Sequence, residues 1–361
     1  MKKFAHIGSY NRNLGDNVAL YNVRKEFNLQ YPNIEWVTLD IRSVFWDRNN
    51  NVSFVKEFFK TNNFDAIVVG GGGLIEYAGY ENQDTGYKLP FNKEIMESIK
   101  CPIYFVGLGI NYFRGQEGFS ETAKQALKDT IEYSTQFSLR NDGSIQILKD
   151  LNIYSNKVVE IPDPGLLYDY EKRKDISSTL NIIQPAFNAN SNINKNRFNG
   201  ENNIQKLVEF VNTNKLLAMP HTHKDYRYFS NFILDEPNLR SLLSFEYTSE
   251  LVKLYLNFNS IVALRGHGQL ISIGLNIPGL YFSTQDKVKD FSLNNGFEEY
   301  NIDINDNNWY DSLIHKHKNI ISNTEYRANW HSIRNAKLKE WNTTFKNYIK
   351  QCLQTSLNTV N

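Results

Sequence analysis

Residues 261–282, with the sequence IVALRGHGQLISIGLNIPGLYF, constrain the fold more than any other stretch, because they contain a complete strand–turn–helix–strand pattern. Residues 261–264 form a continuous apolar run, as a parallel strand buried on both faces requires. The turn RGHG follows, and residues 269–275 have the apolar spacing of a helix that ends before a proline. Residues 279–283 begin the next strand. The pattern predicts one β–α–β unit of an open α/β sheet.

Two ionisable side chains, Arg265 and His267, lie at the turn of this unit. Open α/β sheets bind ligands beyond the carboxyl ends of their strands, close to helix N-termini that favour anions. Gly266 and Gly268 permit a tight turn and a close approach of the backbone to a ligand. The alternative interpretation is a salt bridge made by Arg265 and a helix-capping His267. The glycines and the position at the strand end favour a functional, anion-binding turn.

The rest of the chain repeats this alternation of short apolar runs with helical segments, which predicts mainly parallel sheets. The expected strands lie at 4–8, 34–41, 64–69, 102–107, 136–139, 158–161, 180–187, 215–219, 261–264 and 279–283. A charged, polar segment at 168–178 is expected to link two halves. Residues 188–203 are rich in Asn and predict a mobile loop. A helical pattern extends from Asn308 to about residue 353, with His315 and His317 expected to be solvated.

The composition narrows the class of protein. The chain of 361 residues has a net charge of +1, and 22% of its residues are charged. This balance gives no reason to expect binding to nucleic acid. The two cysteines, Cys101 and Cys352, are far apart in sequence, which argues against a disulfide framework and fits a reducing compartment. With no apolar leader and no apolar run of about 18 residues, the sequence predicts a cytoplasmic protein.

Polar and glycine-rich motifs follow two of the predicted strands in the first half. The motif NLGD at 13–16 opens the first expected helix, where Asn13 or Asp16 would either cap the helix or hold a sugar or an anion. Four glycines at 70–73 follow the third strand, and their N–H groups could donate to a ligand. Glu76 could accept hydrogen bonds from sugar hydroxyls. The glycine run has neither the dinucleotide-binding spacing nor the Lys of a P-loop.

An arginine and two histidines complete the candidates. Arg140 ends a strand in FSLRNDGS, and capping of the next helix would explain the Asp and the Ser but not the Arg. A fixed guanidinium at a strand end suits a phosphate or a carboxylate.

His221 and His223 in PHTHKD resemble a metal pair, but without Cys or a third ligand we expect no metal site. One of the two histidines is expected to contact a ligand instead.

Taken together, these motifs resemble the polysaccharide pyruvyl transferase family. The family pattern has an N-terminal Asn-x-Gly-Asp, a glycine-rich run after a strand, an internal Arg followed by a Ser, and Arg-x-His followed by a Gly and a Pro. This chain has them in the same order, at 13–16, 70–73, 140–144 and 265–267, with Gly274 and Pro278 after the last. The resemblance extends from residue 13 to about residue 290.

The resemblance implies a fold like that of the GT-B glycosyltransferases, α/β with two Rossmann-like domains facing a cleft. We place the acceptor-side domain at 1–170, the domain for phosphoenolpyruvate (PEP) at 171–322, and a C-terminal helix that packs back on the first domain at 323–361. The implied enzyme moves the enolpyruvyl group of PEP onto two hydroxyls of a sugar and releases phosphate. It would act on a lipid- or nucleotide-linked precursor of a capsule or exopolysaccharide, without cofactor or metal. Peripheral contact with the inner membrane face and homo-oligomerisation are compatible with this role.

The resemblance also implies roles for the candidate residues. PEP carries a carboxylate and a phosphate, so its site needs fixed cations. The residues expected around PEP are Arg140, Arg265, His267, Gly268 and Lys287. His267 would protonate the methylene carbon, with Arg265 and Asp16 completing the catalytic group. Asp16, across the cleft, would accept a proton from the acceptor hydroxyl or orient it, and we favour orientation. The residues expected on the acceptor side are Asn13, Gly15, Asp16, Gly71, Gly72, Gly73, Glu76, His221 and His223.

Two other functions remain open from the residues alone. A GT-B glycosyltransferase would bind a nucleotide sugar in place of PEP. A glycan-binding protein with a decayed site would need neither Arg265 nor His267, and the presence of both argues against it.

Overall fold

The computed structural model describes residues 1–46, 51–77, 79–80, 83–111, 118–167, 179–188 and 190–358. The chain divides into two compact units. Unit 1 contains Met1–Tyr10, Ala19–Pro164 and Trp341–Asn361, and unit 2 contains Asn11–Val18 and Gly165–Glu340. The segment predicted as a linker, 168–178, lies outside the described residues.

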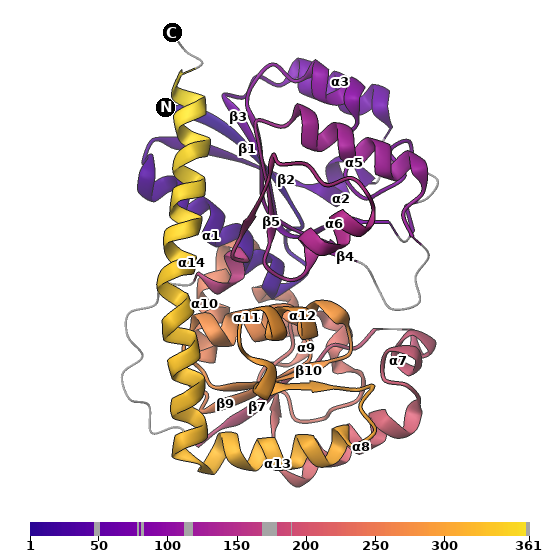
Figure 1. Ribbon diagram of the computed structural model, residues 1–361, viewed down its shortest axis with the longest axis vertical. Helices are drawn as coiled ribbons and strands as arrows, with labels where there is room; N and C mark the ends of the chain where they lie inside the picture. The colour runs from indigo at the N-terminus through magenta and orange to yellow at the C-terminus, as the bar shows by residue number, and fades with distance from the viewer. Residues whose placement is uncertain are drawn as a thin grey trace. The chain divides into compact units, whose positions relative to one another are not determined.

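Unit 1 is built on a six-stranded parallel sheet with the order β2-β1-β3-β4-β5-β6. Its strands are β1 (Lys2–Gly8), β2 (Ile34–Asp40), β3 (Ala66–Glu76), β4 (Ile103–Asn111), β5 (Gln136–Arg140) and β6 (Val158–Ile161). Its helices are α1 (Leu14–Gln30), α2 (Ile41–Val44), α3 (Val52–Thr61), α4 (Lys93–Ser98), α5 (Glu121–Tyr133) and α6 (Ser144–Asp150). Figure 1 shows α1 on one face of this sheet and α3 and α5 on the other.

Unit 2 contains a five-stranded parallel sheet with the order β11-β10-β9-β7-β8. Its strands are β7 (Asn181–Gln184), β8 (Leu217–Ala218), β9 (Ser260–Ala263), β10 (Gly279–Ser283) and β11 (Asn301–Asp303). Its helices are α7 (Ser191–Arg197), α8 (Glu201–Thr213), α9 (Glu236–Leu242), α10 (Thr248–Tyr255), α11 (Gly266–Gly274), α12 (Asp286–Asn294) and α13 (Trp309–Ser322). Figure 1 shows α11 and α12 on one face of this sheet and α8 and α13 on the other.

Burial on both faces explains the apolar runs of β9 and β10. Every residue of β9 and of β10 is buried. A strand covered by helices on both faces has no solvated side, so it cannot alternate polar and apolar residues. The predicted class, α/β with two Rossmann-like parts and a C-terminal helix, is therefore confirmed.

The first turn of α1 packs with unit 2, although the rest of the helix belongs to unit 1. The side-chain amide of Asn17 donates to the carbonyl of Leu243 at 2.9 Å. Phe245 N donates to Oδ1 of Asn11 at 2.7 Å. These bonds attach residues 11–18 to the loop after α9 and so bring the NLGD motif into unit 2.

The last helix, α14 (Thr324–Asn358), is likewise shared between the units. In its first part, Trp330 is fully buried and its Nε1 donates to the hydroxyl of Tyr281 at 3.1 Å, within unit 2. In its last part, the hydroxyl of Tyr348 donates to the carbonyl of Phe105 at 2.7 Å, within unit 1.

Three local expectations were wrong. Residues 188–203, predicted as a loop, contain α7 and the start of α8, and Asn190 caps α7 by accepting from Asn192 N. His317, predicted to be solvated, is buried against Phe210. The helix expected from residue 269 begins at Gly266, so the turn glycines form its first turn.

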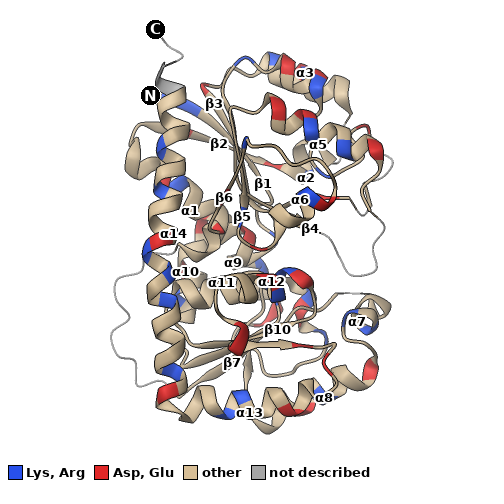
Figure 2. Cartoon of the chain, in the orientation of Figure 1, with Lys and Arg blue, Asp and Glu red and all other residues tan. Residues whose placement is uncertain are grey.

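Charges of both signs are spread over the helices of each unit, as Figure 2 shows. Among the residues that the structure describes, no helix has the length and apolar character needed to cross a membrane.

Candidate functional site

The topology of unit 2 marks one edge of its sheet as a ligand site. After β7 the chain adds β8 on one side, and it then crosses to β9 on the other side of β7. Connections that leave neighbouring strands in opposite directions open a crevice beyond the carboxyl ends of those strands. The chain segments after β7 and β9 meet there, since Leu264 N donates to the carbonyl of Gln184 at 3.0 Å.

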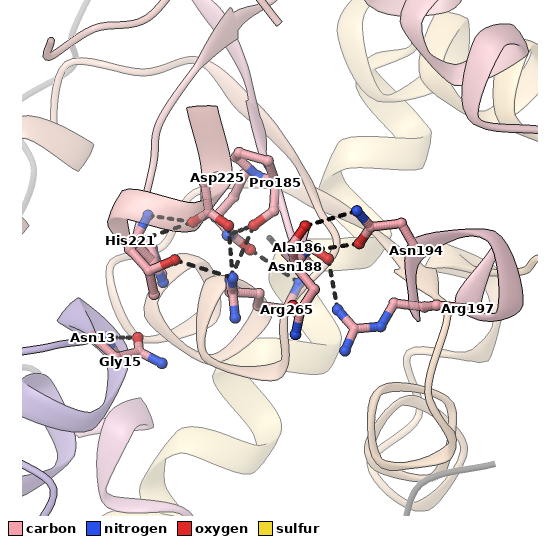
Figure 3. A network of polar contacts seen from close by, with 12 residues as sticks. Asn13, Gly15, Pro185, Ala186, Asn188, Asn194, Arg197, His221, Asp225 and Arg265 are labelled. Atoms are coloured by element: carbon pink, nitrogen blue, oxygen red, sulfur yellow. Dashed lines mark hydrogen bonds and ion pairs between the residues drawn. The ribbon is translucent and has the colours of Figure 1, made fainter. Parts of the chain in front are cut away.

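Arg265 follows β9 at this switch point and is held on several sides. Its Nη2 lies 2.6 Å from Oδ1 of Asp225, and its Nε donates to the carbonyl of Pro185 at 3.1 Å (Figure 3). Asp225 is fully buried, and its other oxygen accepts from the backbone N–H groups of His221 and Thr222 at 2.9 and 3.0 Å. The Arg265 side chain as a whole is 22% exposed. It is therefore a fixed cation that a ligand can reach.

The N-terminus of α11 adds backbone donors beside this cation. Arg265 is the N-cap residue and makes no side-chain cap, and the first helical bond runs from Gln269 N to the carbonyl of Arg265 at 3.1 Å. The N–H groups of residues 266–268 precede that bond and suit an anion. A Cβ on Gly268 would lie 2.4 Å from Oε1 of Gln184, so a larger residue there would displace the Gln184 side chain.

Lys287 and Asp16 lie close to the same turn. Cε of Lys287, at the start of α12, is 4.0 Å from the position that a Cβ on Gly266 would take. Oδ1 of Asp16 lies 3.6 Å from Nδ1 of His267, and both side chains are largely buried. This distance is too long for a strong hydrogen bond, but it allows the carboxylate to stabilise a protonated imidazole.

The NLGD motif reaches His267 because its loop is pinned to unit 2. Leu14 N donates to the carbonyl of His221 at 3.1 Å. Asn13 Oδ1 accepts from Gly15 N at 3.0 Å, as a helix N-cap does (Figure 3). A Cβ on Gly15 would lie 2.1 Å from Cβ of His267. The motif therefore contacts the imidazole directly through a residue that must lack a side chain.

The two histidines of PHTHKD differ in exposure. His221 is fully buried, and its Nε2 is hydrogen-bonded to the hydroxyl of Tyr255. Burial lowers the pKa of His221 and raises the pKa of Tyr255, so both are neutral. His223 is exposed at the start of a 3-10 turn, His223–Arg227. His221 supports the site through its backbone, which contacts Asp225 and Leu14. In the described parts of the chain, no three His, Cys, Asp or Glu side chains are grouped to hold a metal ion.

Arg140 belongs to unit 1 and is engaged by two carboxylates. Its Nε lies 2.5 Å from Oδ2 of Asp142 and its Nη1 lies 2.9 Å from Oδ2 of Asp163. All three side chains are buried. A Cβ on Gly109 would lie 2.3 Å from the guanidinium carbon, so β4 packs against this group. The structure thus gives Arg140 a place in a buried ion network, and its contact with PEP stays a prediction.

The glycine run forms part of β3 rather than a loop after it. A Cβ on Gly70 would lie 2.1 Å from the carbonyl oxygen of Val106 in β4, and one on Gly71 would lie 2.8 Å from Leu20 N in α1. The glycines therefore let β4 and α1 pack closely on β3. Beyond them, Glu76 lies 3.0 Å from Nζ of Lys88 in an ion pair. Acceptor binding by Gly71, Gly72, Gly73 and Glu76 stays a prediction.

Three residues that orient Arg265 were not predicted: Gln184, Thr222 and Asp225. Gln184 Oε1 accepts from Arg265 N at 3.0 Å, and Thr222 Oγ1 accepts from Nη2 at 3.4 Å. Asp225 ends the polar motif PHTHKD, and its position after a strand was a usable signal. Gln184 carries no comparable signal, because only the pairing of β7 with β9 brings it to the site.

Comparison with known proteins gives a family and a fold. The sequence matches the polysaccharide pyruvyl transferase family over residues 13–286. Comparison with curated proteins finds no match. Among solved structures, a UDP-GlcNAc 2-epimerase from Neisseria meningitidis bound to UDP-GlcNAc is similar at 13% identity with a TM-score of 0.52, over 99% of this chain and 100% of the other. HepE from Anabaena, in complex with UDP and glucose, is similar at 8% identity with a TM-score of 0.49, over 100% of both chains.

The structural likeness to the epimerase supports the expected GT-B-like fold and, at this identity, shows the fold alone. The family match spans the NLGD motif, the glycine run, Arg140 and the Arg265–His267 turn.

Proposed function

Because the chain belongs to the polysaccharide pyruvyl transferase family, an enzyme family, we propose that it transfers the pyruvyl group of PEP to a sugar. The product is a cyclic ketal that bridges two sugar hydroxyls, and inorganic phosphate is released. The observation that supports this proposal most is the grouping of Arg265, His267 and Asp16 at the switch point of unit 2. The acceptor would be a lipid- or nucleotide-linked sugar of a surface polysaccharide precursor.

The switch-point site suits an enol phosphate. The N–H groups at the start of α11, together with Arg265 and Lys287, supply donors and positive charge for a phosphate. Asp225 and Gln184 fix Arg265 before the ligand arrives, which reduces the conformational entropy lost on binding.

The reaction begins with a proton transfer from His267 to the methylene carbon of PEP, which becomes a methyl group. The adjacent carbon becomes an oxocarbenium-like centre, and one sugar hydroxyl adds to it. The bond from this carbon to the phosphate oxygen then breaks, and the second hydroxyl adds to close the ring. Of the two hydroxyl protons, one replaces the proton given by His267 and the other leaves with phosphate. Asp16 stabilises the imidazolium from 3.6 Å and orients the acceptor.

The test is incubation of the protein with PEP and galactose-, glucose- or mannose-type acceptors on lipid or nucleotide carriers. We expect phosphate release that depends on the acceptor. With PEP labelled in its carbon atoms, we also expect the label to be transferred to the sugar. Absence of release with every acceptor, in a preparation that does not bind PEP, would contradict the proposal.

A nucleotide-sugar glycosyltransferase is the second candidate, favoured by the fold shared with the epimerase that holds UDP-GlcNAc. It predicts that UDP-sugars stabilise the protein against heat and that PEP does not. A thermal-shift comparison of the two ligands separates the candidates, since a pyruvyl transferase must be stabilised by PEP.

A further inference from the structure

A second arginine lies beside the switch-point cation. Arg197, the last residue of α7, donates from Nη1 to the carbonyl of Ala186 at 2.7 Å. The preceding carbonyl, that of Pro185, accepts from Nε of Arg265. Figure 3 shows both guanidinium groups next to the segment that follows β7. Two consecutive carbonyls therefore hold two guanidinium groups in the same site.

The helix that carries Arg197 is fixed to this segment. Asn194 is fully buried, its Oδ1 accepts from Asn188 N at 2.7 Å, and its Nδ2 donates to the carbonyl of Asn188 at 2.8 Å. The ring of Phe187 stacks on that of Phe198 with centroids 5.2 Å apart. The end of α7 that carries Arg197 is therefore held in place against residues 187–188.

In the described parts of the chain, one carboxylate, that of Asp225, acts on Arg197 against the charge of Arg265. The charge of Asp225 acts on Arg197 without contact, and the oxygens of Asp225 are engaged by Arg265 and by backbone N–H groups. Burial, together with the charge of Arg265, lowers the pKa of Arg197 to about 10. Within the described parts of the chain, Arg197 makes no hydrogen bond or ion pair besides that to Ala186. Two like charges in a half-buried site favour an additional anion.

We infer that Arg197 binds a second anionic group of the ligand, namely the carboxylate of PEP, while the phosphate lies at the start of α11. The inference rests on the proposed function. A planar guanidinium matches a carboxylate with two parallel hydrogen bonds. A ligand with a phosphate alone would satisfy only one of the two cationic positions. The site therefore selects for small molecules that carry both a phosphate and a carboxylate.

The test measures the affinity of wild type and of Arg197→Gln for PEP and for methyl phosphate, which lacks the carboxylate. We expect Arg197→Gln to bind PEP about 10- to 100-fold more weakly and to bind methyl phosphate within about 3-fold of wild type. Arg197→Lys keeps the charge and should recover part of the affinity for PEP. Arg240→Gln is the matched control, because Arg240 is an exposed arginine of α9 paired with Glu236; it should change neither affinity.

Equal affinity of Arg197→Gln and wild type for PEP would overturn the inference, and so would equal losses for PEP and methyl phosphate. If Arg197→Gln does not fold, the same comparison is made with Arg197→Lys. A loss of affinity for PEP without a matching loss for methyl phosphate then supports the inference, and equal changes for both ligands overturn it. The proposed function fails separately, when wild type neither binds PEP nor releases phosphate from it.

Discussion

His267 is the residue on which the proposed chemistry depends most. We expect His267→Ala to lower kcat by at least about 100-fold, because the imidazole is the group proposed to protonate the methylene carbon. The affinity for PEP should stay within a few-fold of wild type, since Arg265, Lys287 and the backbone donors of α11 remain. Steady-state kinetics and PEP titration measure the two effects. His315→Ala, an exposed position on α13, is the control. Near-normal turnover of His267→Ala would remove the general-acid assignment.

Gly15 should act through His267 alone. A Cβ at position 15 would lie 2.1 Å from Cβ of His267, so Gly15→Ala must displace the imidazole. A displacement of about 1 Å lowers rates by roughly 100-fold. We expect a loss of this size in kcat, and we expect Gly15→Ala/His267→Ala to be no slower than His267→Ala. Additive losses in that double-mutant cycle would show that Gly15 has a separate role.

At the level of helices and strands, part of the structure was predictable from the sequence. The strands around the Arg265 turn were predictable, because a strand buried on both faces must be continuously apolar. Arg265 and His267 were therefore found from local pattern. Local pattern did not show that Asp16 lies beside His267, and only the family resemblance suggested its role. Its position depends on bonds between the start of α1 and loops more than two hundred residues away, such as that from Leu14 N to the carbonyl of His221. Arg197 was missed because its Asn-rich helix was interpreted as a loop.

Substitutions of Gly71 and Gly79 test whether the glycine run of β3 serves packing or ligand binding. Gly71 has φ +86 and its Cβ would meet the backbone of α1, whereas Gly79 has φ +85 with open space around it. Gly79→Ala should lower the free energy of unfolding by about 1–2 kcal/mol through the backbone conformation alone. Gly71→Ala should lower it by about 2–5 kcal/mol, because overpacking is added. Denaturant titration measures both. Equal losses, with a raised KM for the acceptor in Gly71→Ala, would favour the ligand role.

For the whole molecule, buried histidines make stability sensitive to acid. His317 is 3% exposed, and burial lowers its pKa from 6.5 to about 4. Burial also lowers the pKa of His6 and of His221. Between pH 6.5 and 4 the unfolded chain binds a proton at position 317 that the folded chain does not. The free energy of unfolding therefore falls with falling pH, by about 1.4 kcal/mol per pH unit for this group.

In His317→Leu, the free energy of unfolding should depend less steeply on pH, by about the 1.4 kcal/mol per pH unit that His317 contributes. Denaturant titrations between pH 7 and pH 4.5 measure this slope. His315→Leu, on the same helix but exposed, is the control and should leave the slope unchanged. An unchanged slope in His317→Leu would mean that His317 is protonated in the folded protein.

The proposed function depends above all on binding of PEP by Arg265 at the switch point of unit 2. Calorimetric titration of wild type and Arg265→Lys with PEP tests it most directly, because lysine keeps a positive charge beside the buried Asp225 and loses only the guanidinium fork. We expect wild type to bind PEP and Arg265→Lys to bind it about 10- to 100-fold more weakly with the fold intact. Absence of PEP binding by wild type, or equal affinity of the two proteins, would contradict it.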